Sequence, residues 1–239
     1  MRAVAASLLG VLAATGMVAA STLNVAPVRV ELSATQSTAV LTVHNLEDSP
    51  VVVQARPAAW SQHDERDQLD DTHDVLVTPP LFTIPAKSEQ ILRIALLRKP
   101  DPMRELDYRL VLSEVPPEVG PDFKGLRMAL RITLPIFGAP QTHASPEVAW
   151  HHEWLPDGTL QIQATNSGTA HIQILDFDVQ GVDHAPQILH SDAARYLLPG
   201  SVARWQLHPA TGLPRTERIV LHGHSDAGDF NVTSDVGAR

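Results

Sequence analysis

Apolar and polar residues alternate along most of the chain, in short runs that proline and glycine separate. This alternation predicts half-buried β-strands, and no stretch has a sustained helical period. Before residue 140 the pattern predicts strands at residues 24–32, 38–45, 51–60, 90–96, 107–115 and 126–137. After it, strands are predicted at residues 159–166, 171–181, 203–208 and 217–224. The sequence therefore predicts an all-β protein of the sandwich type.

The strand pattern breaks once, at the segment QTHASP (141–146). We therefore predict two sandwich domains, residues 21–140 and residues 141–239. Residues 1–20 join Arg2 to an apolar run that ends in small residues, which is the layout of a secretory signal peptide. A single-pass membrane anchor is the alternative, but the run is short and glycine and threonine interrupt it.

Composition narrows the location and the partners. The chain has no cysteine, so an exported form must rely on its hydrophobic core, which favours a bacterial periplasm. Its formal net charge of −9 argues against nucleic acid as a partner. No later segment reaches membrane length, so we expect no membrane insertion once the signal is cleaved.

The segment SQHDERDQLDDTHD (61–74) is highly charged and almost without apolar residues. It is typical of a solvated loop or hinge. A divalent-cation site built from Asp64, Asp67, Asp70 and Asp71 is conceivable. Their spacing, however, lacks the glycine and the terminal glutamate of a calcium loop. We therefore expect a loop here.

Twelve histidines invite a metal hypothesis, but they are scattered. His222 and His224 would share one face of a strand, although no third ligand stands at a motif spacing. The sequence also has no GxSxG elbow, no HExxH motif and no cysteine nucleophile. We therefore predict a protein that is not an enzyme and has no metal and no cofactor.

Several segments, taken in order, carry a family resemblance. In the first half they are LNVAPVRVELS, LTVHN, VTPPLFTIPAKSEQILRI, RELDYRLVLSEVPP and LRITLPIFGAP, and in the second half GTLQIQATNSGTAHIQILDFDV, YLLPGS and HSDAG. From Thr22 to Phe230 the chain resembles the periplasmic pilus chaperones of the chaperone/usher pathway. The resemblance implies two immunoglobulin-like sandwiches arranged as a boomerang. It also implies the partners: a pilin subunit whose own immunoglobulin-like fold lacks a strand, and an outer-membrane usher that receives it.

In this family the strand at residues 126–137 is the donor strand, whose alternate apolar side chains fill the groove of the subunit. The predicted donor side chains all lie on one strand face, and they are Leu126, Met128, Leu130 and Ile132. The alternative is that the same side chains fill this protein's own core. Alternation on one face does not distinguish the two.

The resemblance further implies that the terminal carboxylate of the subunit is bound by an arginine on the first strand and a lysine on the donor strand. The arginine corresponds to Arg29, whose guanidinium can bind a carboxylate bidentately. Thr133 stands where the lysine would be, and a neutral hydroxyl cannot replace a cation. Arg131, on the same strand face, is our candidate substitute. Three possibilities stay open: Arg29 alone, Arg29 with Arg131, or binding elsewhere.

A second implied set of residues links the two domains. By motif it corresponds to Arg93, Glu105 and Asp226, which would fix the interdomain angle more than they would add stability. Two other functions stay open from sequence. The chain could be a structural or adhesive sandwich, either a fibre subunit or a glycan-binding module, or it could be a metal-dependent periplasmic enzyme.

Overall fold

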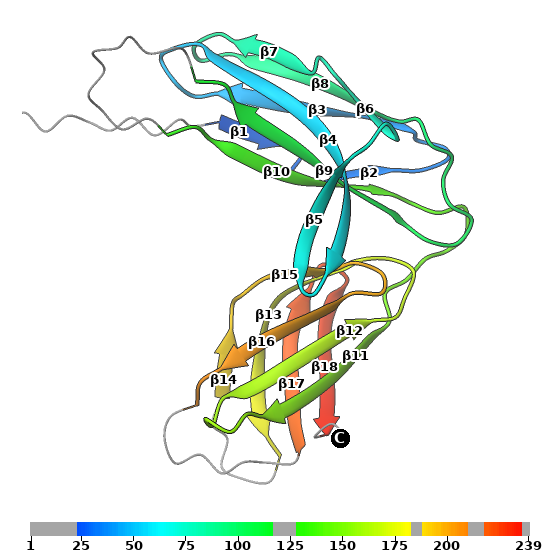
Figure 1. The fold of residues 1–239 in the computed structure, drawn as a ribbon, viewed down its shortest axis with the longest axis vertical. Helices are drawn as coiled ribbons and strands as arrows, with labels where there is room; N and C mark the ends of the chain where they lie inside the picture. Colours follow the sequence, from blue (N-terminus) through cyan, green and yellow to red (C-terminus); the bar gives the residue numbers. More distant parts are fainter. Residues whose placement is uncertain (1–22, 117–127, 183–187, 210–217, 236–239) are drawn as a thin grey trace, which may run out of the picture.

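A computed structural model describes residues 23–116, 128–182, 188–209 and 218–235, and every regular element in them is a β-strand. The strands form two β-sandwiches that lie end to end at an angle (Figure 1). The predicted all-β class is therefore confirmed. None of the described residues forms a helix that could cross a membrane. The predicted signal peptide lies outside the described residues.

The first sandwich contains ten strands. They are β1 (Leu23–Ala26), β2 (Val30–Leu32), β3 (Thr38–Asn45), β4 (Val51–His63), β5 (Arg66–Asp71), β6 (Val75–Thr78), β7 (Leu81–Ile84), β8 (Glu89–Leu96), β9 (Leu106–Glu114) and β10 (Arg131–Gly138). One sheet has the order β1-β3-β8-β6, and the other has the order β2-β10-β9-β4-β5, with β7 also paired to β4. Leu41, Ile94 and Leu110, all fully buried, lie in the single core between the sheets.

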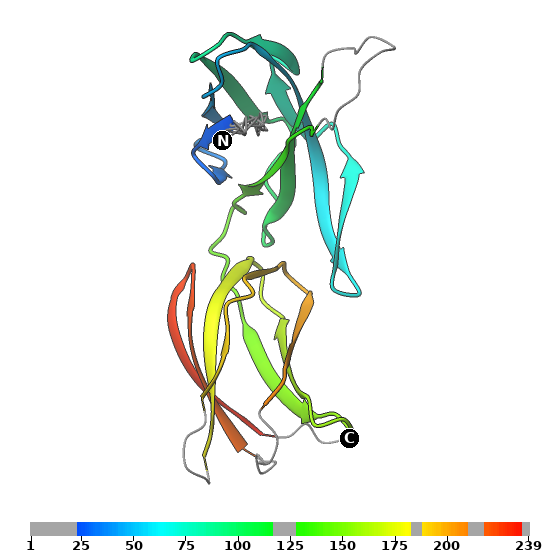
Figure 2. The same cartoon turned by 90° about the vertical axis from the view of Figure 1, so that its left-hand side faces the viewer.

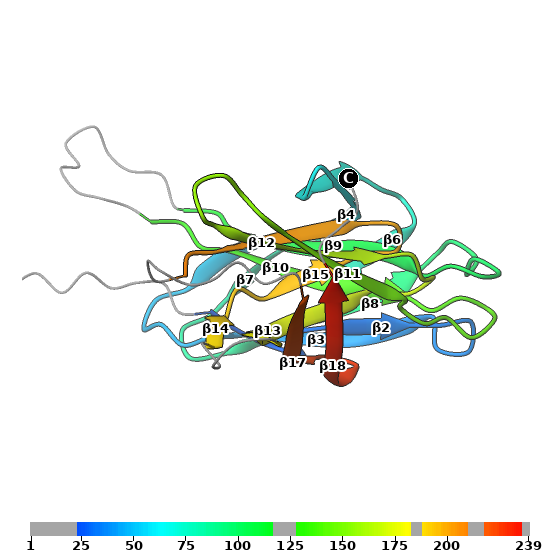
Figure 3. The same cartoon turned by 90° about the horizontal axis from the view of Figure 1, so that it is seen from below.

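The second sandwich contains eight strands. They are β11 (Val148–Trp154), β12 (Leu160–Asn166), β13 (Ile172–Gly181), β14 (Ile188–Ser191), β15 (Arg195–Leu197), β16 (Val202–Leu207), β17 (Arg218–Ser225) and β18 (Gly228–Asp235). The sheets have the orders β11-β12-β16 and β14-β13-β17-β18, with β15 paired to β13. Seen from below, these sheets are the two layers of the sandwich (Figure 3). Ile162, Phe177 and Leu221 lie in the core between them.

The predicted strand at residues 24–32 is in fact two strands that belong to different sheets. β1 pairs with β3, whereas β2 pairs in parallel with β10. Pro27 lacks an amide hydrogen and so ends the first ladder, and the chain crosses from one sheet to the other over residues 27–29. Arg29 ends this crossover. The predicted domain boundary at residue 140 lies in the connection between β10 and β11 and stays a prediction.

The expected charged loop at residues 61–74 was wrong, because most of it is a β-hairpin. β4 continues to His63, and β5 pairs with it from Ala58↔Asp71 to His63↔Arg66. The two-residue turn has positive φ at both Asp64 (48°) and Glu65 (63°), which is the backbone of a type I′ hairpin turn. The hairpin extends from the first sandwich to the second (Figures 1 and 2).

Candidate functional site

The outer edge of β10 is open over its first half. On one side β10 pairs with β9 along its whole length, from Arg131↔Ser113 to Gly138↔Leu106. On the other side β2 pairs only with residues 136–138. In the described part of the chain no strand covers residues 131–135 on that side. Their outward backbone groups are therefore available to a partner strand, until Pro135 interrupts the row of amide hydrogens.

The predicted donor side chains lie in different surroundings. Met128 is 59% exposed and Leu130 is half-buried. Ile132 packs against the core of its own sandwich, as the alternative interpretation of this strand expected. Leu126 lies outside the described residues. Leu130 already runs beside β9, because the Glu114 amide donates to its carbonyl at 2.9 Å. Met128 and Leu130 thus provide the exposed apolar surface of this edge.

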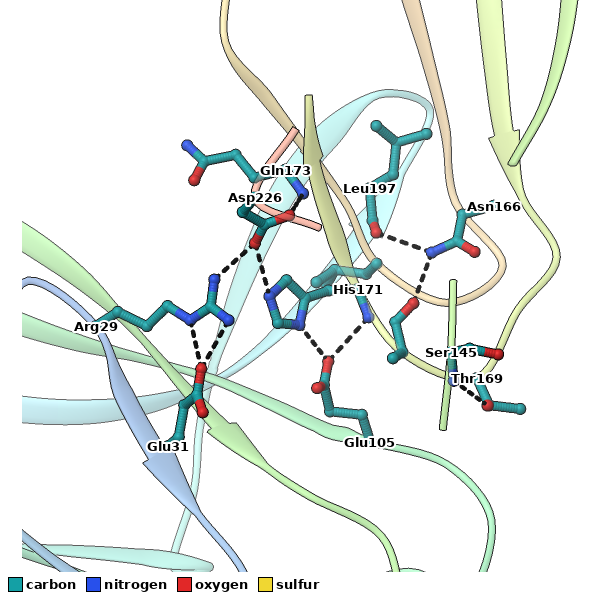
Figure 4. A network of polar contacts seen from close by, with 12 residues as sticks. Arg29, Glu31, Glu105, Ser145, Asn166, Thr169, His171, Gln173, Leu197 and Asp226 are labelled. Atoms are coloured by element: carbon teal, nitrogen blue, oxygen red, sulfur yellow. Dashed lines mark hydrogen bonds and ion pairs between the residues drawn. The ribbon is translucent and has the colours of Figure 1, made fainter. Parts of the chain in front are cut away.

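Arg29 projects from the crossover before β2 toward the second sandwich. Its Nε donates to Glu31 Oε1 at 2.8 Å, and its Nη2 lies 2.7 Å from the same oxygen. Its Nη1 donates to Asp226 Oδ2 at 2.6 Å (Figure 4). The predicted carboxylate-binding arginine is therefore already paired with two carboxylates, one from each sandwich.

The other two predicted carboxylate ligands lie further along the strand. Arg131 and Thr133 are both exposed on β10. The parallel register places Val30 beside Ile136, so Arg29 lies level with Pro135. Thr133 and Arg131 are then about 7 and 13 Å along the strand from that level, at a rise of about 3.3 Å per residue. Arg131 makes no polar side-chain contact within the described ranges.

Two of the three predicted linking residues meet at the junction of the sandwiches, through a residue that the sequence did not reveal. His171 Nδ1 lies 2.6 Å from Glu105 Oε1, and its Nε2 lies 3.4 Å from Asp226 Oδ2 (Figure 4). The His171 amide also donates to Glu105 at 3.0 Å. Arg93 is not part of this cluster: it is exposed on β8 and has no polar side-chain contact among the described residues. Arg29 is the cation that joins Asp226 instead.

The surroundings of Asp226 keep its carboxyl group ionised. Burial opposes its ionisation, but His171, the Gln173 amide and Arg29 all favour the carboxylate and lower its pKa to about 2. Burial likewise opposes protonation of His171. Its two carboxylate neighbours outweigh burial and raise the pKa of the imidazole. The junction therefore favours a charged histidine between two acids.

Asp107 has a partly buried carboxyl group, with its Oδ1 atom inaccessible to solvent, and its pKa is shifted in the opposite direction. It lies on β9, where its Cα partner is Phe137 on β10. Burial, and then the charge of the neighbouring Glu105, raise the pKa of Asp107 to about 8. This carboxyl group therefore holds a proton near neutral pH.

A small apolar cluster supports the charged one. Trp60, Phe137 and Leu198 are buried together, with Leu69 and Tyr196 packed against them. The Phe137 ring stacks on the imidazole of His171, with centroids 3.5 Å apart and planes 6° apart. Both sandwiches contribute side chains to this cluster. The junction therefore has a small apolar core of its own, and the charged residues lie at its edge.

The β4–β5 hairpin forms the third part of the junction. Glu65 at its turn accepts the Arg204 amide at 2.9 Å and pairs with the Arg204 Nη1 at 2.6 Å. Gln62 donates to the Tyr196 carbonyl and accepts the Leu198 amide, both at 3.0 Å. The charges that the sequence suggested as a solvated loop thus bind the second sandwich.

Histidine and aspartate side chains do not assemble a metal site in the described residues. His222 and His224 lie on β17, as predicted, and His224 Nδ1 is 2.7 Å from Asp176 Oδ1. Asp67 pairs instead with Gln62 and Arg109, and Asp71 with Arg56. These carboxylates serve ion pairs of the hairpin.

Comparison with known proteins agrees with this architecture. The profile of the family described as pili and flagellar-assembly chaperone, PapD N-terminal domain, matches residues 22–144. A search of curated proteins found no match.

Three solved structures have a similar fold. One is a chain of the CsuC–CsuE chaperone–tip adhesion subunit pre-assembly complex of Acinetobacter baumannii, at 16% identity and a TM-score of 0.66, covering 91% of this chain and 100% of that one. The YadV chaperone matches at 18% identity and 0.63, covering 90% and 99%. A chain of the Salmonella enterica SafA pilin–SafB chaperone complex matches at 19% identity and 0.61, covering 91% and 98%.

Proposed function

This chain belongs to the pili and flagellar-assembly chaperone family, a non-enzymatic class, and on that premise we propose how it holds its cargo. An incompletely folded pilus subunit adds a strand to the open edge of β10, between Met128 and Thr133. The same protein then delivers the subunit to an outer-membrane usher, and both steps take place in the periplasm.

The open edge of β10 is the observation that supports this proposal. A β-strand edge without a neighbour offers backbone hydrogen bonds, which supply affinity, while alternate side chains supply specificity. Met128 is 59% exposed and Leu130 is half-buried, so both side chains have surface that a subunit groove could cover. Complete burial of an exposed side chain contributes about 1.5–3 kcal/mol, and these two, which are already partly buried, would contribute less than that before the costs of ordering. The family relation favours this function over a fibre subunit or a glycan-binding module.

We propose that the terminal carboxylate of the subunit binds at the other end of this edge. Arg29 lies there, level with Pro135, and its guanidinium suits a carboxylate. Arg131 lies midway along the open edge, where it can contact the backbone or a side chain of the added strand. Thr133 carries no charge and has no electrostatic role.

Co-expression with a candidate pilus subunit tests the proposal. We expect a soluble one-to-one complex that Leu130→Asp abolishes, because a charge cannot enter an apolar groove without a large desolvation cost. Leu76→Asp is the matched control, since Leu76 is 49% exposed on β6 in the other sheet. A complex that survives Leu130→Asp but not Leu76→Asp would refute the assignment of the edge.

A further inference from the structure

The guanidinium of Arg29 presents two binding edges, and a carboxylate occupies each. Glu31 Oε1 accepts a hydrogen bond from Nε at 2.8 Å and forms an ion pair with Nη2 at 2.7 Å. The side of a guanidinium formed by these two nitrogens is the fork that matches both oxygens of a carboxylate. Asp226 binds Nη1, away from that fork. Glu31 therefore contacts the two nitrogens of the fork with one carboxylate oxygen, although the fork can bind two.

The two carboxylates are held with different firmness. Asp226 Oδ1 accepts the Gln173 amide at 2.8 Å, and the Asp226 amide donates to the Gln173 carbonyl at 3.0 Å. Its side chain is 17% exposed, whereas that of Glu31 is 67% exposed. In the described part of the chain Glu31 has no polar side-chain partner other than Arg29. Asp226 is thus fixed to β13, and Glu31 can turn into water at small cost.

The charges around Arg29 determine whether a carboxylate can bind there in addition to Glu31 and Asp226. Arg29 faces Glu31 and Asp226, and beyond Asp226 the imidazole of His171 faces Glu105. Even with a protonated histidine, three carboxylates surround two cations. Another carboxylate at Arg29 would therefore meet a net negative site, and like charges within a few ångströms repel strongly in a partly buried site. One internal carboxylate has to leave before another can bind.

We infer that Glu31 is an internal stand-in for the terminal carboxylate of the subunit: it occupies the fork of Arg29 in the free protein, and the subunit displaces it while Asp226 keeps the guanidinium in place. This inference rests on the proposed function. The incoming carboxylate can engage both nitrogens with two oxygens, where Glu31 engages them with one. Free anions displace Glu31 only at higher concentration, so the exchange favours a carboxylate that the added strand has already positioned.

Acetate, the smallest carboxylate probe, tests the exchange without a subunit. The readout is the ¹⁵Nε–H signal of Arg29, assigned by its loss in Arg29→Lys and followed during an acetate titration at constant ionic strength. We expect Glu31→Gln to lower the half-saturating acetate concentration about two- to fivefold, the range for release of an exposed ion pair. Glu89→Gln is the matched control, because Glu89 is a 54% exposed strand glutamate that pairs with His44. Equal titrations of Glu31→Gln and the wild type would overturn the inference.

A pilus subunit that forms a complex with this protein extends the test to the exchange itself. Differently tagged wild-type and Glu31→Gln proteins compete for limiting subunit, which ends either in a free carboxylate or in a semisynthetic amide. We expect Glu31→Gln to win about two- to fivefold with the carboxylate and to show no advantage with the amide. Asp226→Asn should change affinity in the opposite direction, because the guanidinium loses its positioning group.

The outcomes separate the two proposals. An advantage of Glu31→Gln that persists with the amide, or a gain from both Glu31→Gln and Asp226→Asn, would overturn the stand-in role and leave the binding edge intact. No complex with any variant, including the wild type, would overturn both.

Discussion

The two halves of β10 have the same strand geometry and opposite surroundings. From Leu134 to Gly138 every residue is buried, whereas Arg131 and Thr133 are exposed and Ile132 is only partly buried. The closed half has β9 on one side and, at its end, β2 on the other, and its Phe137 stacks on the second sandwich. The open half has only β9. One strand therefore anchors the junction with one half and offers an edge with the other.

The difference between the two halves of β10 explains how this strand can keep an open edge without loss of stability. An unpaired strand edge is usually a liability, because it invites pairing with other chains. Here the closed half fixes the strand in the fold, so the open half needs no partner to stay extended. Substitutions in the closed half should therefore affect folding, and those in the open half should affect binding.

The largest effect is expected in the closed half. Ile136 is fully buried in the core of the first sandwich. Ile136→Ala should lower the free energy of unfolding by about 2–5 kcal/mol, because it removes buried methylene groups and leaves a cavity. Urea unfolding followed by circular dichroism measures the change. A loss below about 1 kcal/mol would show that this half is less tightly packed than its burial indicates.

The proton on Asp107 should make the closed half sensitive to pH. Its pKa is raised from 3.8 to about 8 in the folded protein, so the folded state keeps a proton that the unfolded state has lost. Stability should accordingly fall as pH rises from about 4 to about 8, with a slope of up to about 1.4 kcal/mol per pH unit. Asp107→Asn should flatten this part of the profile, measured as the unfolding midpoint between pH 5 and pH 8. An unchanged profile in the variant would assign the pH dependence to other groups.

A smaller effect is expected at the hairpin that covers the junction. Glu65→Gln removes the charge that pairs with Arg204, at a contact where both side chains are partly exposed. The expected loss is about 0.2–1 kcal/mol, and it should shrink in high salt because ions screen exposed pairs. Asp70→Asn on the same hairpin is the control, since Gln68 is the only polar partner of the Asp70 side chain among the described residues. Equal losses for the two variants would contradict a specific role of Glu65.

The smallest effect on folding is expected in the open half. Met128→Ala should change the free energy of unfolding by less than about 0.5 kcal/mol, because the side chain is 59% exposed. The same substitution should weaken the complex with the subunit. Urea unfolding measures the change in stability, and a pull-down of the co-expressed subunit from the same preparation measures the change in binding. A large loss of stability would place Met128 in the fold rather than at the edge.

Most of the long strands with one buried face could be predicted from sequence. The four-residue strands β6 and β7, which also have a buried face, and the polar strand β5 could not. The strand predicted at residues 38–45 is β3 as observed, because its apolar residues alternate toward the core. β5 escaped notice because its residues are polar apart from Leu69, and that leucine packs on the junction cluster instead of a sheet core. Alternation of apolar residues indicates burial against the strand's own sandwich, and β5 is exposed apart from the partly buried Leu69.

The candidate site shows the same division. Motif order brought Glu105, Asp226 and Arg29 to attention, and the structure places all three at the junction. His171 lies in one of the family-like segments but was given no role there, since its role arises only when β13 meets Phe137 and Glu105 from the first sandwich. The double pairing of Arg29 was equally hidden, because Asp226 is distant in sequence. The placement of Arg131 and Thr133 on the open strand followed directly from alternation, while their distance from Arg29 needed the register with β2.

The shared cluster of Trp60, Phe137, Leu198, Leu69 and Tyr196 makes the two sandwiches poor candidates for modular exchange. A chimera that pairs the first sandwich with the second sandwich of a distant relative would have to import matching counterparts of Tyr196 and Leu198 as well. Without them, the side chains of Trp60 and Phe137 would be exposed to water and would favour aggregation. We therefore expect the two sandwiches to be inherited together. Substitutions in the shared cluster should arise in pairs, one in each sandwich, that compensate for each other.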